Sequence, residues 1–238
     1  MANKKATALQ SFGLFAVAIA LFLGLRWSLF EPFLIPSGSM IPTLLVNDHI
    51  LVSKYDYGLR LPFTSFWITN PSLPKRGDIV VFRSVDQDDY YLIKRVIGLP
   101  GDKIDFNAEG ELRINDEAVA SKEIAMPKSY TSAEIETEPE KYQMFDERIG
   151  EHNHALLLEK NAFHYAVNNH IVPAGKIFMM GDNRDRSRDS RFWGDLPIEN
   201  LIGRARWVWL SCSGTVSNLN FLCDPRQIRW QQTFRRIE

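Results

Sequence analysis

The sequence has few cysteines and almost no net charge, and both shortages exclude classes of protein. Only Cys212 and Cys223 occur among 238 residues, which is too few for a disulfide-scaffolded fold, and their spacing is not a zinc-binding pattern. The formal net charge is -1, so the chain lacks the basic surface that binding to phosphates requires, and we expect no nucleic-acid partner. No repeat with a period of about 20–50 residues is present, which excludes solenoids and propellers.

Charged side chains are also missing from one long N-terminal run. Residues 6–25 are uncharged and mostly apolar, and a helix of about 20 such residues can cross a membrane. A cleavable signal peptide is one alternative, but its apolar region is usually about 7–15 residues long and precedes a small-residue cleavage site. A buried soluble helix is another, but nothing charged gives this run a wet face. We therefore predict a cytoplasmic N-terminus over 1–5 and an uncleaved transmembrane anchor over 6–30.

The flanking charges predict the orientation of this anchor. Lys4 and Lys5 precede the uncharged run, whereas Arg26 is the only lysine or arginine between the end of that run and Lys54. Because basic residues stay in the cytoplasm, the rest of the chain is expected on the extracytoplasmic side of the membrane.

Beyond the anchor, short β-branched and apolar runs predict a mainly β structure. These runs are 49–52, 78–82, 91–97, 177–180 and 202–210. Turns rich in proline and glycine separate them, and no long amphipathic helix appears outside the anchor.

The middle of the chain, residues 107–175, is polar and divides two better-patterned blocks, 31–106 and 176–238. Four of the five histidines lie in this middle part, away from any predicted strand: His152, His154, His164 and His170. A His-x-His pair can bind a metal, but no cysteine and no clear carboxylate spacing completes a site, so we expect no metal and no other cofactor.

Ser39 and Lys94 are the candidate catalytic pair. Ser39 lies in the segment Ile-Pro-Ser-Gly-Ser-Met-Ile-Pro-Thr-Leu (35–44), where two prolines and a glycine bend the backbone. It can serve as a nucleophile if a base is adjacent, or simply form a turn. His49 has no obvious carboxylate partner, so a Ser-His-Asp triad is not favoured. Lys94 lies in an apolar strand where burial would lower its pKa and make it a base, unless its amine reaches water.

Four ordered blocks together resemble bacterial type I signal peptidase, a family of Ser-Lys dyad serine proteases. The blocks are Pro-Ser-Gly-Ser-Met-x-Pro-Thr-Leu from Pro36, Lys-Arg-Gly-Asp-Ile-Val-Val-Phe from Lys75, Lys-Arg-Val-x-Gly-x-Pro-Gly-Asp from Lys94, and Gly-Asp-Asn-Arg-Asp-x-Ser-x-Asp-Ser-Arg from Gly181. The resemblance spans about 31–106 and 177–209. It implies an antiparallel β-sheet catalytic core, in two parts over 31–106 and 176–238, with an inserted β-rich cap over 107–175. Many Gram-negative members have two membrane spans, whereas this sequence has one.

The resemblance also implies a role for each matching residue. Ser39 is the nucleophile, Lys94 the general base, and the Ser37 hydroxyl joins the Ser39 backbone N–H in the oxyanion hole. Ser187 hydrogen-bonds and orients the lysine. The remaining matches support the site: an ion pair of Asp189 with Arg191, and a turn containing Asp182 and Asn183. Because a close carboxylate would keep Lys94 charged, Asp182 and Asp189 should point away from its amine.

The function implied is that of a membrane-bound serine endopeptidase. It would cleave N-terminal signal peptides from exported preproteins after a small-x-small motif, with preproteins and membrane lipid as its partners. The location implied is the inner (cytoplasmic) membrane, single-pass, with the catalytic domain on the periplasmic or extracytoplasmic side. A self-cleaving Ser-Lys protease of the repressor type is the nearest rival, but it lacks a membrane anchor. A catalytically dead relative acting as a tethered binding module would be expected to lose Ser39 or Lys94.

Two further features carry predictions. Cys212 and Cys223 should form a disulfide, because the domain lies in an oxidising compartment, the alternative being two free buried thiols. Residues 61–71 contain Phe63, Phe66, Trp67 and Ile68 between two prolines, and we predict that this loop rests in the lipid interface rather than in the core.

Overall fold

The computed structural model describes residues 2–58, 66, 68–69, 72–86, 90–127, 139–216 and 219–237. Within these ranges the side chains at 2–10, 21, 25–27 and 220–221 lie outside the description.

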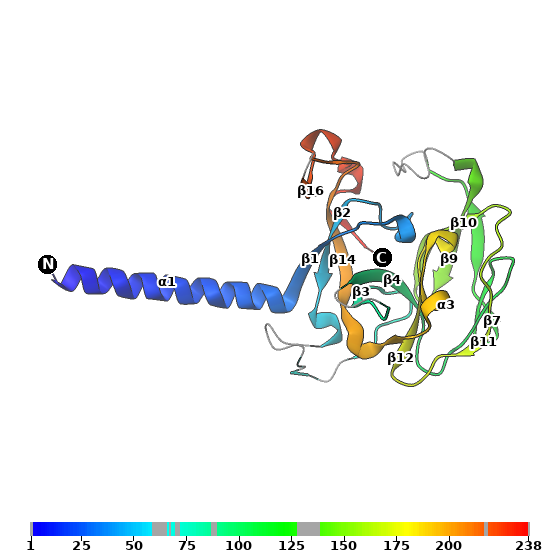
Figure 1. The fold of residues 1–238 in the computed structure, drawn as a ribbon, viewed down its shortest axis with the longest axis horizontal. Helices are drawn as coiled ribbons and strands as arrows, with labels where there is room; N and C mark the ends of the chain where they lie inside the picture. The colour runs from blue at the N-terminus through cyan, green and yellow to red at the C-terminus, as the bar shows by residue number, and fades with distance from the viewer. Residues whose placement is uncertain are drawn as a thin grey trace.

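One helix, α1 (Ala2–Leu29), forms the N-terminal part and extends away from the rest of the molecule (Figure 1). Its described apolar side chains are exposed, as at Phe12, Phe15 and Phe22. In the part of the chain that the structure describes, no helix is both long enough and apolar enough to cross a membrane. The helix lies where the anchor was predicted, but the predicted membrane crossing over 6–30 is not found. The side chains at 6–10, 21 and 25–27 of that range lie outside the described residues.

An antiparallel sheet in the order β1-β2-β14-β3-β4-β12-β13 forms the core, and β17 pairs with β14. The strands are β1 (Phe30–Leu34), β2 (Asp48–Ser53), β3 (Ile79–Arg83), β4 (Tyr91–Gly98), β12 (Lys176–Met180), β13 (Leu196–Pro197), β14 (Leu201–Ser211) and β17 (Arg235–Arg236). All five predicted apolar runs lie in these strands, except that Asp78 precedes β3, and the prediction of a mainly β, antiparallel fold is confirmed.

The core sheet is covered on both faces, which explains its continuous apolar runs. In β3, Ile79 and Val81 pack into one buried cluster with Met40, while Val80 and Phe82 pack into another. A strand that is buried on both sides needs no polar alternation, and β-branched residues suit its pleated surface.

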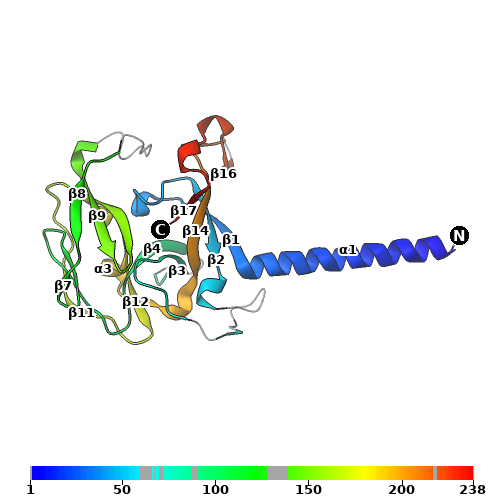
Figure 2. The ribbon, with the colours of Figure 1, turned by 180° about the vertical axis from the view of Figure 1, so that it is seen from behind.

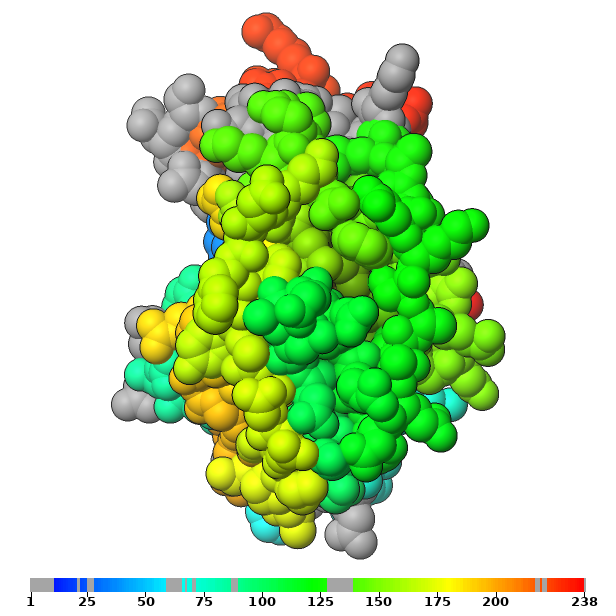
Figure 3. All heavy atoms as spheres, turned by 90° about the vertical axis from the view of Figure 1, so that its right-hand side faces the viewer, coloured from blue at the N-terminus to red at the C-terminus, as the bar shows by residue number. Residues whose placement is uncertain are grey.

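The middle of the chain forms a second, cap region of two small sheets. One has the order β10-β9-β8 and the other β11-β5-β6-β7. Their strands are β5 (Lys103–Phe106), β6 (Leu112–Ile114), β7 (Glu117–Ala118), β8 (Ser121–Ile124), β9 (Tyr142–Ile149), β10 (His152–Glu159) and β11 (Val167–Ile171). The cap covers the end of the molecule opposite α1 (Figure 3). Strand β5 precedes the expected cap boundary at 107, although it pairs with β6 and β11.

Three of the four histidines of this region lie on strands, which corrects the expectation from polar composition, while His164 lies between β10 and β11. His152 and His154 lie on β10, and His170 lies on β11. Along β10 the side chains of His154, Leu156 and Leu158 are buried on one face, and Leu157 is buried on the other. Polar residues of the same strand, such as Asn153 and Glu159, hide this buried run in the composition.

A disulfide joins Cys212, which follows β14, to Cys223 at the end of the C-terminal hairpin of β15 (Thr215–Val216) and β16 (Leu219–Cys223), with 5.8 Å between the Cα atoms. We expect unfolded, unreduced protein to show no free thiol and reduced protein to show two. Replacing both cysteines with serine should lower the free energy of unfolding by about 3 kcal/mol through loop-closure entropy. Two reactive thiols before reduction would contradict the bond.

The loop predicted at 61–71 is described only in part. Phe66 and Ile68 are 70% and 57% exposed, so they do not fill the core. Phe63 and Trp67 lie outside the described residues. Contact of this loop with lipid stays a prediction.

Candidate active site

Ser39 lies in a single 3₁₀ turn, η1 (Gly38–Met40), that follows β1. The neighbouring side chains of Ile35 and Met40 are buried in the core cluster and fix the turn from both sides. Ser39 itself is only 8% exposed, so its side chain is largely shielded from solvent.

Lys94 approaches this turn from β4, and its Nζ donates a hydrogen bond to Ser39 Oγ at 2.6 Å. It also donates to the Ile93 carbonyl at 2.9 Å, and only 3% of its surface is exposed. Burial lowers the pKa of Lys94 to about 8, while Asp189 and Asp182 oppose the shift and Arg191 supports it. The alternative in which the amine reaches water does not occur. A neutral amine is therefore accessible near physiological pH, in contact with a hydroxyl.

The segment after β12 holds Ser39 in place. The Asn183 N–H donates to the Ser39 carbonyl at 3.1 Å, and Asn183 Nδ2 donates to the Gly38 carbonyl at 3.0 Å. A Cβ on Gly181 would lie 2.4 Å from Ser39 O and 2.3 Å from Ser187 Oγ. Only glycine permits this approach, which gives a physical reason for the Gly-Asp-Asn sequence.

The expected ion pair between Asp189 and Arg191 is formed and buried. Arg191 Nε donates to Asp189 Oδ1 at 2.8 Å, and Arg191 Nη2 donates to Asp189 Oδ2 at 2.9 Å. Asp189 also accepts from the Gly181 N–H at 3.0 Å and is the N-cap of the short helix α3 (Ser190–Trp193). Both Asp189 and Asp182 thus bind arginines rather than Lys94, as expected, although their charges still raise the lysine pKa.

Ser187 and Ser37 lie close to the pair without the contacts that the resemblance implied. Within the described residues, Ser187 Oγ is buried and has no hydrogen-bond partner, so the expected bond to Lys94 is not made. Ser37 is exposed and extended, with φ −136 and ψ 157, at the start of the turn that carries Ser39. Its hydroxyl caps no backbone N–H. The lysine-orienting and oxyanion roles of these two serines stay predictions.

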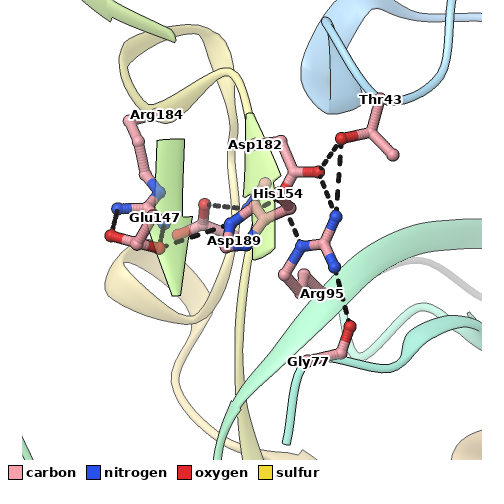
Figure 4. A network of polar contacts seen from close by, with 9 residues as sticks. Thr43, Gly77, Arg95, Glu147, His154, Asp182, Arg184 and Asp189 are labelled. Carbon is pink, nitrogen blue, oxygen red and sulfur yellow. Dashed lines mark hydrogen bonds and ion pairs between the residues drawn. The ribbon is translucent and has the colours of Figure 1, made fainter. Parts of the chain in front are cut away.

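The sequence did not predict the buried ion pair of Arg95 with Asp182 (Figure 4). Arg95 donates from Nε to Asp182 Oδ1 at 2.8 Å and from Nη2 to Asp182 Oδ2 at 2.7 Å. Its Nη1 donates to the Gly77 carbonyl at 2.8 Å, and Thr43 Oγ1 donates to Asp182 Oδ2. Arg95 is fully buried. The available signal was an arginine next to Lys94 in an apolar strand, because alternation places the two side chains on opposite faces.

A second buried cluster comes from the cap. Arg184, in the 3₁₀ turn η4 (Arg184–Arg186), forms an ion pair with Glu147 of β9, and Arg184 Nη1 donates to Glu147 Oε1 at 3.1 Å. Burial would raise the pKa of Glu147, but Arg184 and His154 lower it to about 2. His154 lies beside both ion pairs, since its Nε2 is 3.3 Å from Glu147 Oε2 and 3.8 Å from Asp182 Oδ1. Nothing in the local sequence around these residues indicated the contacts.

A groove lies between the end of β1 and the start of β4. It has a cavity volume of about 250 Å³ and a mostly apolar lining, which includes Phe33, Ile35, Pro36, Val81 and Ile93. The lining comes from residues just before Ser39 and just before Lys94. In the described part of the chain, no group of three or more potential ligand residues could hold a metal ion.

Comparisons with known proteins show what the whole chain is similar to. The family described as "Signal peptidase, peptidase S26" matches residues 8–210. Signal peptidase I of Pseudomonas fluorescens is 40% identical over 221 residues, which cover 88% of this chain and 75% of that protein. Signal peptidase I of Rickettsia felis is 37% identical over 261 residues, covering 99% of this chain and 95% of that protein. A solved signal peptidase I from Enterococcus faecalis V583 is 25% identical, covers 56% of this chain and 97% of its own, and has a TM-score of 0.35.

Proposed function

The chain belongs to the signal peptidase family, peptidase S26, and is a serine peptidase. From this premise we propose that it removes signal peptides from exported preproteins, with Ser39 as nucleophile and Lys94 as general base. The observation that carries the assignment is the 2.6 Å contact between Lys94 Nζ and Ser39 Oγ in a buried setting.

The proposed reaction proceeds through an acyl-enzyme. Neutral Lys94 takes the Ser39 proton as the oxygen attacks the scissile carbonyl, and it later gives a proton to the leaving amine. The Ser39 N–H and the Ser37 hydroxyl stabilise the oxyanion. Lys94 then activates water to release the signal peptide from Ser39. The ion pairs of Asp182 and Asp189 with their arginines keep both carboxylates from binding the lysine directly.

The substrate would bind as an extended strand in the groove between β1 and β4. Backbone groups along these strands can pair with an added strand, and the shallow apolar lining suits small side chains before the cut. This arrangement supports a small-x-small preference.

We place the reaction at the inner membrane, with the catalytic domain on the extracytoplasmic side and a single N-terminal anchor. Two observations support this placement: the uncharged run at 6–25, and the exposed apolar side chains of α1. Liposome flotation of the full chain and of a form lacking residues 1–30 tests it. Equal flotation of both forms would contradict a role for the helix.

Incubating the purified full chain in detergent with a preprotein tests the activity. The expected result is a single cut after a small-x-small site. Binding without cleavage would favour a catalytically dead module, and cutting of its own chain alone would favour the repressor-type protease.

The pH dependence of cleavage should follow the loss of a proton from the Lys94 amine. Because the reacting form is the neutral amine, kcat/KM is expected to be low in acid and to rise through a pKa of about 8. The measurement is kcat/KM for a peptide substrate between pH 6 and about 10. A profile that is flat across this range would mean that the reaction does not depend on deprotonating Lys94.

A further inference from the structure

We propose that His154, on the cap strand β10, is a positioning residue that ties the cap to the turn that holds the catalytic pair. This inference rests on the proposed peptidase activity. It makes the cap part of the catalytic machinery rather than an independent module.

The side chain of His154 lies between two carboxylates, each of which has its own arginine (Figure 4). On one side is Glu147 of β9, which is paired with Arg184. On the other is Asp182, which is paired with Arg95. The ring is 6% exposed, so its volume separates and orients the two ion pairs.

The backbone of the same strand contacts the same turn. Leu157, three residues after His154, donates its N–H to the Asp182 carbonyl at 2.9 Å and forms an isolated parallel bridge with Asn183. Strand β10 therefore contacts Asp182 through both a side chain and the main chain. Asn183 in turn donates to the Ser39 carbonyl.

Both halves of the dyad depend on this turn. Ser39 is bound to it through its carbonyl, and Lys94 is connected to it through the adjacent Arg95 on β4. A displacement of 1 Å between reacting groups can cost about 100-fold in rate. A shift of β10 would therefore displace both Ser39 and Lys94 from their reacting positions.

Burial favours a neutral ring at His154. Burial and the charge of Arg95 lower the pKa of His154, whereas Asp182 and Glu147 oppose the shift. Arg184 of η4 lies beyond Glu147. On its open side, His154 adjoins a polar cavity of about 250 Å³ whose lining includes Thr43 and the β17 residues Arg235 and Arg236. The C-terminal end of the chain lies between the core and the cap in this region (Figure 2).

Removal of the ring should open a path from this cavity toward Asp182. Water entering there would loosen the pair of Asp182 with Arg95 and reduce the burial that lowers the pKa of Lys94. The expected consequences are a lower kcat and a higher lysine pKa, with little change in KM because the substrate groove and this cavity share no lining residue.

The test compares His154→Ala, His154→Phe and His154→Gln in the full chain in detergent micelles. Two readouts are used: kcat and KM for a peptide substrate across pH, and the titration of Lys94 followed by its carbon-13 signal in lysine-labelled protein. Asn153→Ala is the matched control, because Asn153 is the exposed neighbour on the same strand. Circular dichroism establishes that each variant is folded.

We expect His154→Ala and His154→Gln, which both remove the ring, to lower kcat by about 10-fold to 100-fold and to raise the Lys94 pKa. His154→Phe, which keeps a ring of similar volume, should recover most of both, and Asn153→Ala should match the wild type. If alanine prevents folding, the contrast between phenylalanine and glutamine decides. Wild-type kcat and Lys94 titration in both of these variants would overturn the proposal. Absence of cleavage by the wild type would instead overturn the proposed function, and the Lys94 titration would still test the positioning role.

Discussion

Replacing Lys94 with alanine is expected to lower preprotein cleavage by about 10⁴-fold or more. The amine that contacts Ser39 Oγ at 2.6 Å is the proposed base, and a serine hydroxyl without a base is a weak nucleophile. Ser39→Ala should lose activity to the same extent. Because the two groups act as a unit, Ser39→Ala/Lys94→Ala should be little worse than either single variant.

The measurement is kcat/KM for a preprotein or peptide, with folding followed by circular dichroism. Lys94→Met is a useful companion, because it keeps an apolar side chain of similar length in the buried strand. Lys103→Ala is the control, since this lysine is paired with Asp116 at the surface, and its loss should leave cleavage unchanged. Near-normal activity in Lys94→Ala or Lys94→Met would disprove the dyad.

The strand pattern could be predicted because it depends on local sequence, and the dyad because each of its residues lies in a short recognisable motif. Continuous β-branched runs such as 78–82 and 91–97 indicate buried strands, and they coincide with β3 and β4. The pairing of Ser39 with Lys94 came from the resemblance of short motifs, since 55 positions separate the two residues in sequence. Physical reasoning from the strand alone could not choose between a buried lysine and one that reaches water.

The contacts of the cap could not be predicted, because they depend on how separate sheets pack. His154, Glu147 and Arg184 lie in polar sequence that is typical of solvated surface, and only their burial against the turn after β12 reveals the network. Strand β5 shows the same limit. It continues the sequence of the catalytic core, yet its partners are the cap strands β6 and β11.

The buried pair of Arg95 with Asp182 should be the most sensitive feature of the fold outside the dyad. Arg95→Ala leaves a carboxylate that is 1% exposed without its counter-charge, and removal of one partner of a buried pair typically costs about 3–5 kcal/mol. Activity should fall as well, because Asn183, the neighbour of Asp182, holds the Ser39 carbonyl. Urea denaturation at constant m-value measures the free energy of unfolding.

Arg188→Ala is the matched control for this substitution, since Arg188 pairs with Asp86 at the surface with 75% of its side chain exposed. An exposed pair contributes about 0–1 kcal/mol, so a similar cost for both substitutions would contradict the role of burial.

The pH dependence of stability gives a second check on the pair of Arg95 with Asp182. Burial would raise the pKa of Asp182, but Arg95 lowers it, so the wild type keeps this stabilisation above the unfolded pKa of about 4 and loses it as the pH falls further. In Arg95→Ala the isolated carboxyl should take up a proton at higher pH than in the unfolded chain. The difference in stability between wild type and variant should therefore be largest near neutral pH and shrink in acid, and a difference that grew in acid would show that Asp182 is not the group left unpaired.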